Sequence, residues 1–190
     1  HNTAVGYHAA LNLSSAIKTV AIGSDAIGAG VTTGDKNTAV GQGAGYSLTS
    51  GDSNTLLGQD AGVALTTGAD NVMIGTNAGD NDDATSNTVL IGKNAGGSIN
   101  HTDANGTVAV GAQACAMLTN ADFNTALGFQ ALHSLTEGGG NTVIGYNAMS
   151  ASNGDQNGNV AIGNKAMASI SNENSVASNV AIGGEALYGG

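Results

Sequence analysis

The chain has 190 residues, of which 31 are glycine, none is proline or tryptophan, and only 3% are aromatic, so it lacks the bulky side chains of an ordinary globular core. Because 41% of the residues are apolar and only 9% are charged, the composition also argues against a disordered chain. Four lysines and 14 acidic residues give a net charge of −10, which disfavours nucleic acid and anionic membranes as partners. No apolar run reaches the roughly 18 residues that a spanning helix needs, so we expect no membrane insertion.

The sequence repeats a short unit that is marked by one glycine. These landmark glycines recur every 17 to 20 residues, at Gly6, Gly23, Gly41, Gly58, Gly75, Gly92, Gly111, Gly128, Gly145, Gly163 and Gly183. The unit around each of them is [NT]-[TV]-x-[VIL]-G-x-x-A, and no repeat departs from it. Because the repeat fills the chain from Asn2 onward, we expect one repeat domain over residues 1–190 that belongs to a longer fibre protein.

Each unit predicts one short β-strand, because two β-branched or aliphatic residues at a spacing of two, bounded by Asn and Gly, are typical of strands. We expect strands over residues 3–5, 20–22, 38–40, 55–57, 72–74, 89–91, 108–110, 125–127, 142–144, 160–162 and 180–182. A chain that coils in one direction places equivalent residues of successive repeats side by side, about 4.8 Å apart. The sequence therefore predicts an all-β parallel β-solenoid of about eleven turns, called rungs below, which form a rod about 50 Å long.

Both faces of each predicted strand are apolar. We expect the first and third positions, which are Thr or Val and Val, Ile or Leu, to face inward, and the apolar middle position then needs a second cover. One further apolar column is available, formed by Leu13, Leu48, Leu65, Ile99, Leu118, Leu135 and Ile170. Gly30, Asp82 and Ser152 interrupt it. We therefore expect self-association to complete the burial, as a parallel homotrimer in which folding and assembly are coupled.

Two polar features accompany the strands. The Asn that stands four residues before most landmark glycines either forms a ladder of side-chain amides along the rod or simply suits a turn, and both interpretations stay open. The polar stretches at residues 80–86, 100–106 and 171–178 are predicted to bulge outward as loops.

Several of these strings resemble known fibre repeats. NTAVG begins at Asn2 and Asn37, NTVIG at Asn141, and NVAIG at Asn159 and Asn179. They are similar to the head repeats of trimeric autotransporter adhesins and to NTAVG-type repeats of bacteriophage tail fibres. The resemblance implies a left-handed β-roll of three identical chains, located outside the cell as a virion appendage or on a bacterial surface. The rungs of 17 to 20 residues, and the Thr or Val where the adhesin repeat has Ser, favour the phage fibres.

The residues that could carry chemistry do not form a known catalytic pattern, so we expect no enzyme activity and no cofactor. The four histidines occupy unrelated repeat positions, which argues against a catalytic triad. Cys115 shares a column with Ile27 and Met149 and is predicted to be a core thiol. Asp80, Asp82 and Asp83 are the candidates for a calcium site, against the simpler interpretation of a solvated acidic loop.

Three aromatic residues share the position after the landmark glycine and are candidate contacts for a ligand such as a sugar: Tyr7, Phe129 and Tyr146. Single exposed aromatics are also common on protein surfaces.

The sequence as a whole favours a structural and adhesive fibre segment, with a glycan or protein receptor on a host surface as its expected partner. The alternative is an ice-binding solenoid. Against it, the Thr column has five Thr and six Val and lies on the strand face that we expect to be buried.

Overall fold

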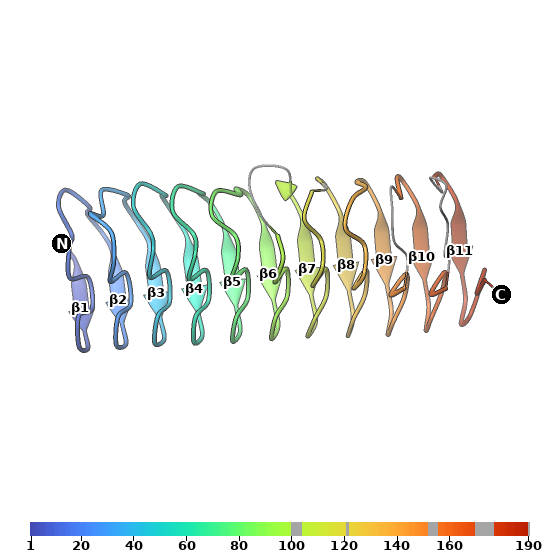
Figure 1. Cartoon of the computed structure of the whole chain (residues 1–190), viewed down its shortest axis with the longest axis horizontal. Helices are drawn as coiled ribbons and strands as arrows, with labels where there is room; N and C mark the ends of the chain where they lie inside the picture. The colour runs from blue at the N-terminus through green and yellow to red at the C-terminus, as the bar shows by residue number, and fades with distance from the viewer. Residues whose placement is uncertain (100–103, 121, 152–155, 170–176, 190) are drawn as a thin grey trace.

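The chain coils into a straight rod in which each turn contributes one strand (Figure 1). The computed structural model describes residues 1–99, 104–120, 122–151, 156–169 and 177–189. The eleven strands are β1 (Thr3–Val5), β2 (Val20–Ile22), β3 (Thr38–Val40), β4 (Thr55–Leu57), β5 (Val72–Ile74), β6 (Val89–Ile91), β7 (Val108–Val110), β8 (Thr125–Leu127), β9 (Thr142–Ile144), β10 (Val160–Ile162) and β11 (Val180–Ile182). These are the predicted ranges, so the all-β solenoid is confirmed.

The strands form one parallel sheet in which each strand pairs only with its neighbours in sequence. Thr3 lies opposite Val20 and Val5 opposite Ile22, and the same positions are paired between every two successive rungs. The two chain ends consequently lie at opposite ends of the rod (Figure 1). The predicted register is confirmed.

The orientation of the strands is the reverse of the prediction. From β2 to β11 the middle residue is buried, whereas the first and third residues are half-buried or exposed. The interior of the coil, which we call the lumen, is narrow and receives one column of side chains from the strands. When all three strand residues are apolar, the alternation of side chains does not determine which face of the strand points inward. The narrow lumen has room for one side chain per strand, so the single middle residue points inward and the other two point outward.

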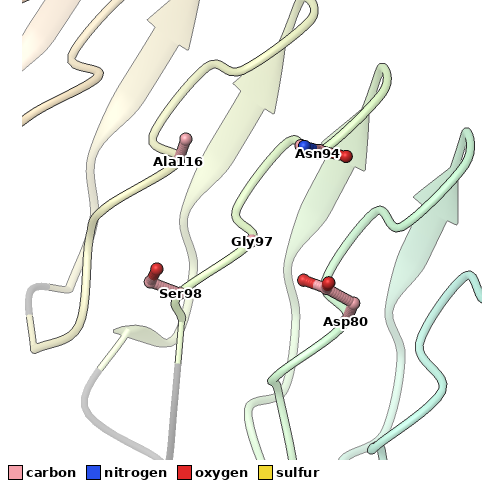
Figure 2. A pocket seen from close by; sticks show the side chains of 5 residues that line it. All are labelled: Asp80, Asn94, Gly97, Ser98 and Ala116. Atoms are coloured by element: carbon pink, nitrogen blue, oxygen red, sulfur yellow. The ribbon is translucent and has the colours of Figure 1, made fainter.

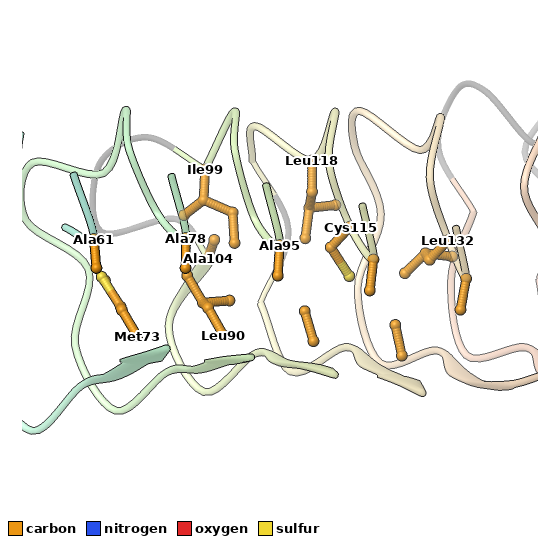
Figure 3. Packing of buried hydrophobic residues seen from close by; sticks show 14 of the residues in the cluster. Ala61, Met73, Ala78, Leu90, Ala95, Ile99, Ala104, Cys115, Leu118 and Leu132 are labelled. Atoms are coloured by element: carbon orange, nitrogen blue, oxygen red, sulfur yellow. The ribbon is translucent and has the colours of Figure 1, made fainter. Parts of the chain in front are cut away.

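The lumen is filled by side chains of complementary size from two opposite walls. One wall is the middle strand position, and the other includes the fourth residue after each landmark glycine. Large strand residues face glycines in the pairs Leu56 and Gly62, Met73 and Gly79, and Leu90 and Gly96. Small strand residues share their rungs with large ones in the pairs Ala109 and Cys115, Ala126 and Leu132, and Ala161 and Met167. Met73 and Leu90 extend into the lumen from the sheet, and Cys115 and Leu132 from the opposite wall (Figure 3).

The landmark glycines are required because their carbonyl groups stack closely along the rod. Gly6 has a φ of 136°, and a Cβ on it would lie 2.5 Å from the carbonyl oxygen of Gly23. No L side chain fits this combination of positive φ and close approach. The turn that follows closes with a hydrogen bond from the Ala9 N–H to the Gly6 carbonyl, at 3.4 Å, with His8 at a φ of 54°. This geometry is that of a type II turn, and it recurs along the rod.

The Asn column forms the predicted ladder, so the first of the two interpretations is confirmed. The Oδ1 atom of Asn54 accepts the backbone N–H of Asn71 at 3.1 Å, and its Nδ2 atom donates to the Gly68 carbonyl at 2.9 Å. Nδ2 also donates to Oδ1 of Asn37 at 3.1 Å. Each such amide therefore joins its rung to the next, and because these groups are buried, their hydrogen bonds satisfy backbone atoms that would otherwise be costly to bury.

The prediction of outward loops is wrong in part. Asp82 and Thr85 are fully buried, and so is Ala104. Asp82 occupies the lumen column in which other rungs carry Leu or Ile, and Thr85 lies beside it, so this stretch continues the coil instead of leaving it. Residues 100–103 of the second stretch and 171–176 of the third lie outside the described residues.

Candidate interaction surfaces

The outside of the sheet is a surface made mainly of apolar residues. It consists of the first and third residues of all eleven strands, and we call it the outer face. Leu57 is 45% exposed in the middle of the rod, and Ile182 is 67% exposed near its C-terminal end. This surface was missed in the sequence because both alternating sets of strand residues are apolar. The inverse sizes of the two lumen columns were the signal that could have revealed it.

The Thr column lies on this outer face. The interpretation that it faces a buried side of the strand is therefore wrong for the single chain, because Thr55 and Thr125 are exposed. Its members are Thr3, Thr38, Thr55, Thr125 and Thr142, and Val takes the place of Thr in the other six rungs. The parallel register holds these hydroxyl and methyl groups in one straight row along the rod.

The three candidate aromatic residues fall into two separate groups. Phe129 and Tyr146 stand on successive rungs, with ring centroids 5.6 Å apart and ring planes 11° apart, and they are 45% and 50% exposed. Tyr7 lies in the first rung, where it contacts the ring of His8 at a centroid distance of 3.7 Å. The structure thus joins two of the three predicted contact residues into one stacked pair on the surface.

The three candidate calcium ligands have different surroundings. Asp82 points into the lumen, where its carboxylate accepts hydrogen bonds from the Thr85 N–H at 2.9 Å and from the Thr85 hydroxyl. Burial raises the pKa of Asp82 to about 6, although the hydrogen bonds from Thr85 act in the opposite direction. Among the described residues, no three His, Cys, Asp or Glu side chains are grouped so that they could hold a metal ion.

Asp80 lies instead at a shallow surface cavity of about 170 Å³. Figure 2 shows the cavity lining, which consists of Asp80, Asn94, Gly97, Ser98 and Ala116. Partial burial raises the pKa of Asp80, and hydrogen bonds from the backbone at Asp80 and Asn81 partly offset this effect. The cavity therefore presents one carboxylate and two neutral polar side chains, which is a small hydrogen-bonding site with a single acidic group.

His8 and Cys115 lie in ordinary structural surroundings, and Nδ1 of His133 is 3.2 Å from the hydroxyl oxygen of the adjacent Ser134. His8 Nδ1 is 3.4 Å from the Asp25 carboxylate, but the Ser24 hydroxyl donates its hydrogen bond to Asp25 and not to the imidazole. Cys115 is fully buried in the lumen as predicted, and burial raises the pKa of its thiol to about 12. The thiolate that nucleophilic chemistry requires is therefore suppressed at neutral pH. His101 lies outside the described residues.

The described part of the chain contains no helix long and apolar enough to cross a bilayer.

Comparison with models of known protein families, with curated proteins and with solved structures finds no match to the chain. At the level that the structure supports, the chain is a β-solenoid repeat protein with rungs of about 17 residues.

Proposed function

We propose that this chain is a non-enzymatic segment of an extracellular fibre, a stiff spacer and surface-contact rod in which three parallel copies pack through their outer faces. The observation that supports the proposal best is the outer face itself, in which one column of Val, Ile and Leu and one column of Val and Thr run the length of the rod. The resemblance of the repeats to those of phage tail fibres and trimeric adhesins supports the same role, as a virion appendage or on a bacterial surface.

The size of the outer face favours association over a solitary rod. Ten spacings of about 4.8 Å and strands of three residues give a flat area on the order of 500 Å². That is at the upper end for the largest apolar patch on a monomeric protein. Three such faces would together bury on the order of 1,500 Å², or about 500 Å² for each of three contacts. One such contact alone is smaller than a standard stable interface, so a ring that closes all three contacts is favoured over a pair.

The number three comes from the resemblance to trimeric fibre repeats. The outer face is compatible with it, because this face is two side-chain columns wide and a first column packed against the third column of a neighbouring copy can be repeated by rotation until the ring closes. Because every rung repeats the same two positions, the contact would be the same at each level of the rod. The net charge of −10 lies outside these columns and opposes sideways clustering of complete trimers.

Substitution of Ile144 by Asp tests the interface. Ile144 is only half-buried in the single chain, and the variant should lose the trimer, because an assembled rod would bury three carboxylates at one level. If folding and assembly are coupled, the fold is lost together with the trimer, and if they are not, the variant is a folded monomer. Ser50→Asp adds the same charge at an exposed position outside the sheet and should stay trimeric. The measurement is the molar mass by light scattering at micromolar concentration.

Val143→Asp serves a different purpose, because Val143 points into the lumen. It should destabilise the chain whatever its oligomeric state. A wild-type monomer or dimer in light scattering would contradict the trimer, and a trimeric Ile144→Asp variant would show that another surface forms the interface.

Ice binding is a second candidate function, and the exposure of Thr55 and Thr125 on a straight, flat row favours it. A monomeric rod that shows thermal hysteresis, reduced when Thr125 and Thr142 are both replaced by Val, would support ice binding. A trimer without thermal hysteresis would eliminate it.

A further inference from the structure

The surface column formed by the residues just after the landmark glycines has a small side chain at Ala112, between two long ones. Lys93, Ala112 and Phe129 occupy this position in three successive rungs. Backbone hydrogen bonds hold the three in register: the Gln113 N–H donates to the Lys93 carbonyl at 2.9 Å, and the Gln130 N–H donates to the Ala112 carbonyl at 3.0 Å. The small side chain of Ala112 therefore stands between two long ones, and we call this place the Ala112 gap.

The width of the Ala112 gap suits one flat ring. Two rung spacings separate Lys93 from Phe129, which gives about 9.6 Å between their backbone positions. A ring held between two walls at contact distances of about 3.5 to 4.0 Å needs about 7 to 8 Å. One ring layer therefore fits, and two do not.

Phe129 offers a fixed wall for such a ring. One face of its ring is stacked on Tyr146 in the next rung, with 11° between the planes, so its other face is directed back toward the rung of Ala112. Stacking restricts the rotamers of both side chains, so little further entropy is lost when a ligand packs against Phe129. Lys93, which is exposed, supplies a flexible alkyl stem as the opposite wall.

Amide groups lie beside the gap. Gln113 and Gln130 follow Ala112 and Phe129 in the chain, and the Nε2 atom of Gln130 donates to the Oε1 atom of Gln113 at 2.8 Å. This bond fixes the orientation of both amides and leaves the N–H donors of Gln113 and the oxygen of Gln130 with capacity for further hydrogen bonds. Paired donors and acceptors beside an apolar wall suit a ring that carries hydroxyl groups.

We propose that the Ala112 gap binds one pyranose ring of a surface glycan, with the C–H face of the sugar against Phe129 and its hydroxyl groups on the amides of Gln113 and Gln130. A nucleobase is also flat, but its phosphates would meet a chain of net charge −10 that has only four cationic side chains. The assignment rests on the proposed surface-contact role of the rod and does not depend on the number of chains in it.

The test measures binding of the intact chain to immobilised β-1,3-glucan, α-mannan, xylan and chitin, followed by titration with an oligosaccharide of whichever polymer binds. Ala112→Phe fills the gap in a column that already accepts Phe in the following rung, and it should weaken binding at least tenfold. Phe129→Ala removes the wall and should weaken binding about five- to tenfold. Gln59→Phe adds the same aromatic ring at the same position three rungs away from Ala112 and should bind like the wild type.

Thermal melting of each variant establishes that the fold is intact, and light scattering of the same samples separates this proposal from the trimer. Binding that is weakened by Ala112→Phe but not by Gln59→Phe supports the site even if the chain is a monomer. Binding that survives Ala112→Phe overturns it, and so does failure of the wild type to bind any of the four polymers at millimolar sugar concentration.

Discussion

The rungs of β3–β6 and those of β7–β10 fill the same lumen from opposite walls. In the first region the fourth residue after the landmark glycine is itself Gly in every rung, and the strands β4–β6 supply the large residues Leu56, Met73 and Leu90. In the second region the same position holds Cys or larger side chains, and the strands supply Ala or Val. Figure 3 contains the boundary between the two regions, at Leu90 and Cys115.

From β4 to β10 the difference teaches that one wall supplies a large side chain in every rung, while the choice of wall is free to change. The rung of β3 carries Ala39 and Gly45, and there a methyl carbon of Leu56 from the next rung reaches the space beside Gly45. A Cβ on Gly62 would lie 2.9 Å from a Leu56 methyl carbon, so the space opposite a large strand residue is already occupied. The backbone is the same in both regions, because Gly62 has a φ of 57° and Leu132 has a φ of 56°. The second region therefore accepts the strain of a left-handed non-glycine residue in return for a filled lumen.

The largest change in stability is expected when a rung of the first region is converted to the packing pattern of the second region. Leu90→Ala leaves a cavity and should lower the free energy of unfolding by about 3 kcal/mol, and Gly96→Leu alone should lower it by at least about 2 kcal/mol through overpacking. The double variant recreates the arrangement of Ala126 and Leu132 and should recover most of the loss. Urea unfolding at one fixed protein concentration measures this coupling. A double variant as unstable as the sum of the single ones would contradict a free choice of wall.

Asp82 is an acidic residue in the otherwise apolar lumen of the first region, and its substitution should give the next largest change in stability. Its pKa is about 6 in the folded chain against 3.8 for an ordinary Asp, so ionisation destabilises the fold. This penalty is absent below about pH 3, grows as the pH rises from 4 to 6, and is complete at pH 7.5, where it is about 2 to 3 kcal/mol. Asp82→Asn keeps an acceptor for Thr85 and should be more stable than the wild type by that amount at about pH 7.5, and equally stable at about pH 3.

Unfolding of both proteins across this pH range is the measurement. Asp70→Asn, which removes one charge at an exposed position, controls for the change in net charge. Equal stability of wild type and Asp82→Asn at pH 7.5 would mean that Thr85 fully compensates for the burial of the carboxylate.

The smallest change in stability is expected when a single methyl group is added to the lumen. In Gly79→Ala the new Cβ would lie 2.7 Å from the sulfur of Met73, at a backbone φ of 60°, and we expect a loss of about 1 to 2 kcal/mol in urea unfolding. Ala10 occupies the same position in the first rung at a φ of 53°, so the backbone itself accepts alanine. No loss in Gly79→Ala would show that Met73 has room to move and that the first region is packed more loosely than the second.

The strict glycine period was enough to predict the strands, their register and the burial of Cys115, because each of these follows from stacking like residues on like. The Asn ladder was one of two interpretations that the sequence left open. The direction in which the strands face was not predictable from alternation, since Val72, Met73 and Ile74 are all apolar. Asp82 was assigned to a loop because an acidic residue is rarely buried without a partner, and its partner Thr85 becomes visible only in three dimensions.

The connection of each rung only to its neighbours gives the rod a distinctive response to force. Tension along the axis pulls directly on the hydrogen bonds between two rungs, and once the terminal rung yields, the next becomes terminal in turn. A rung of 17 residues that occupies about 4.8 Å of the rod releases roughly 55 Å of extended chain. A tethered rod of this design therefore lengthens in steps under load, and it dissipates the energy of a sudden pull by unfolding one rung at a time.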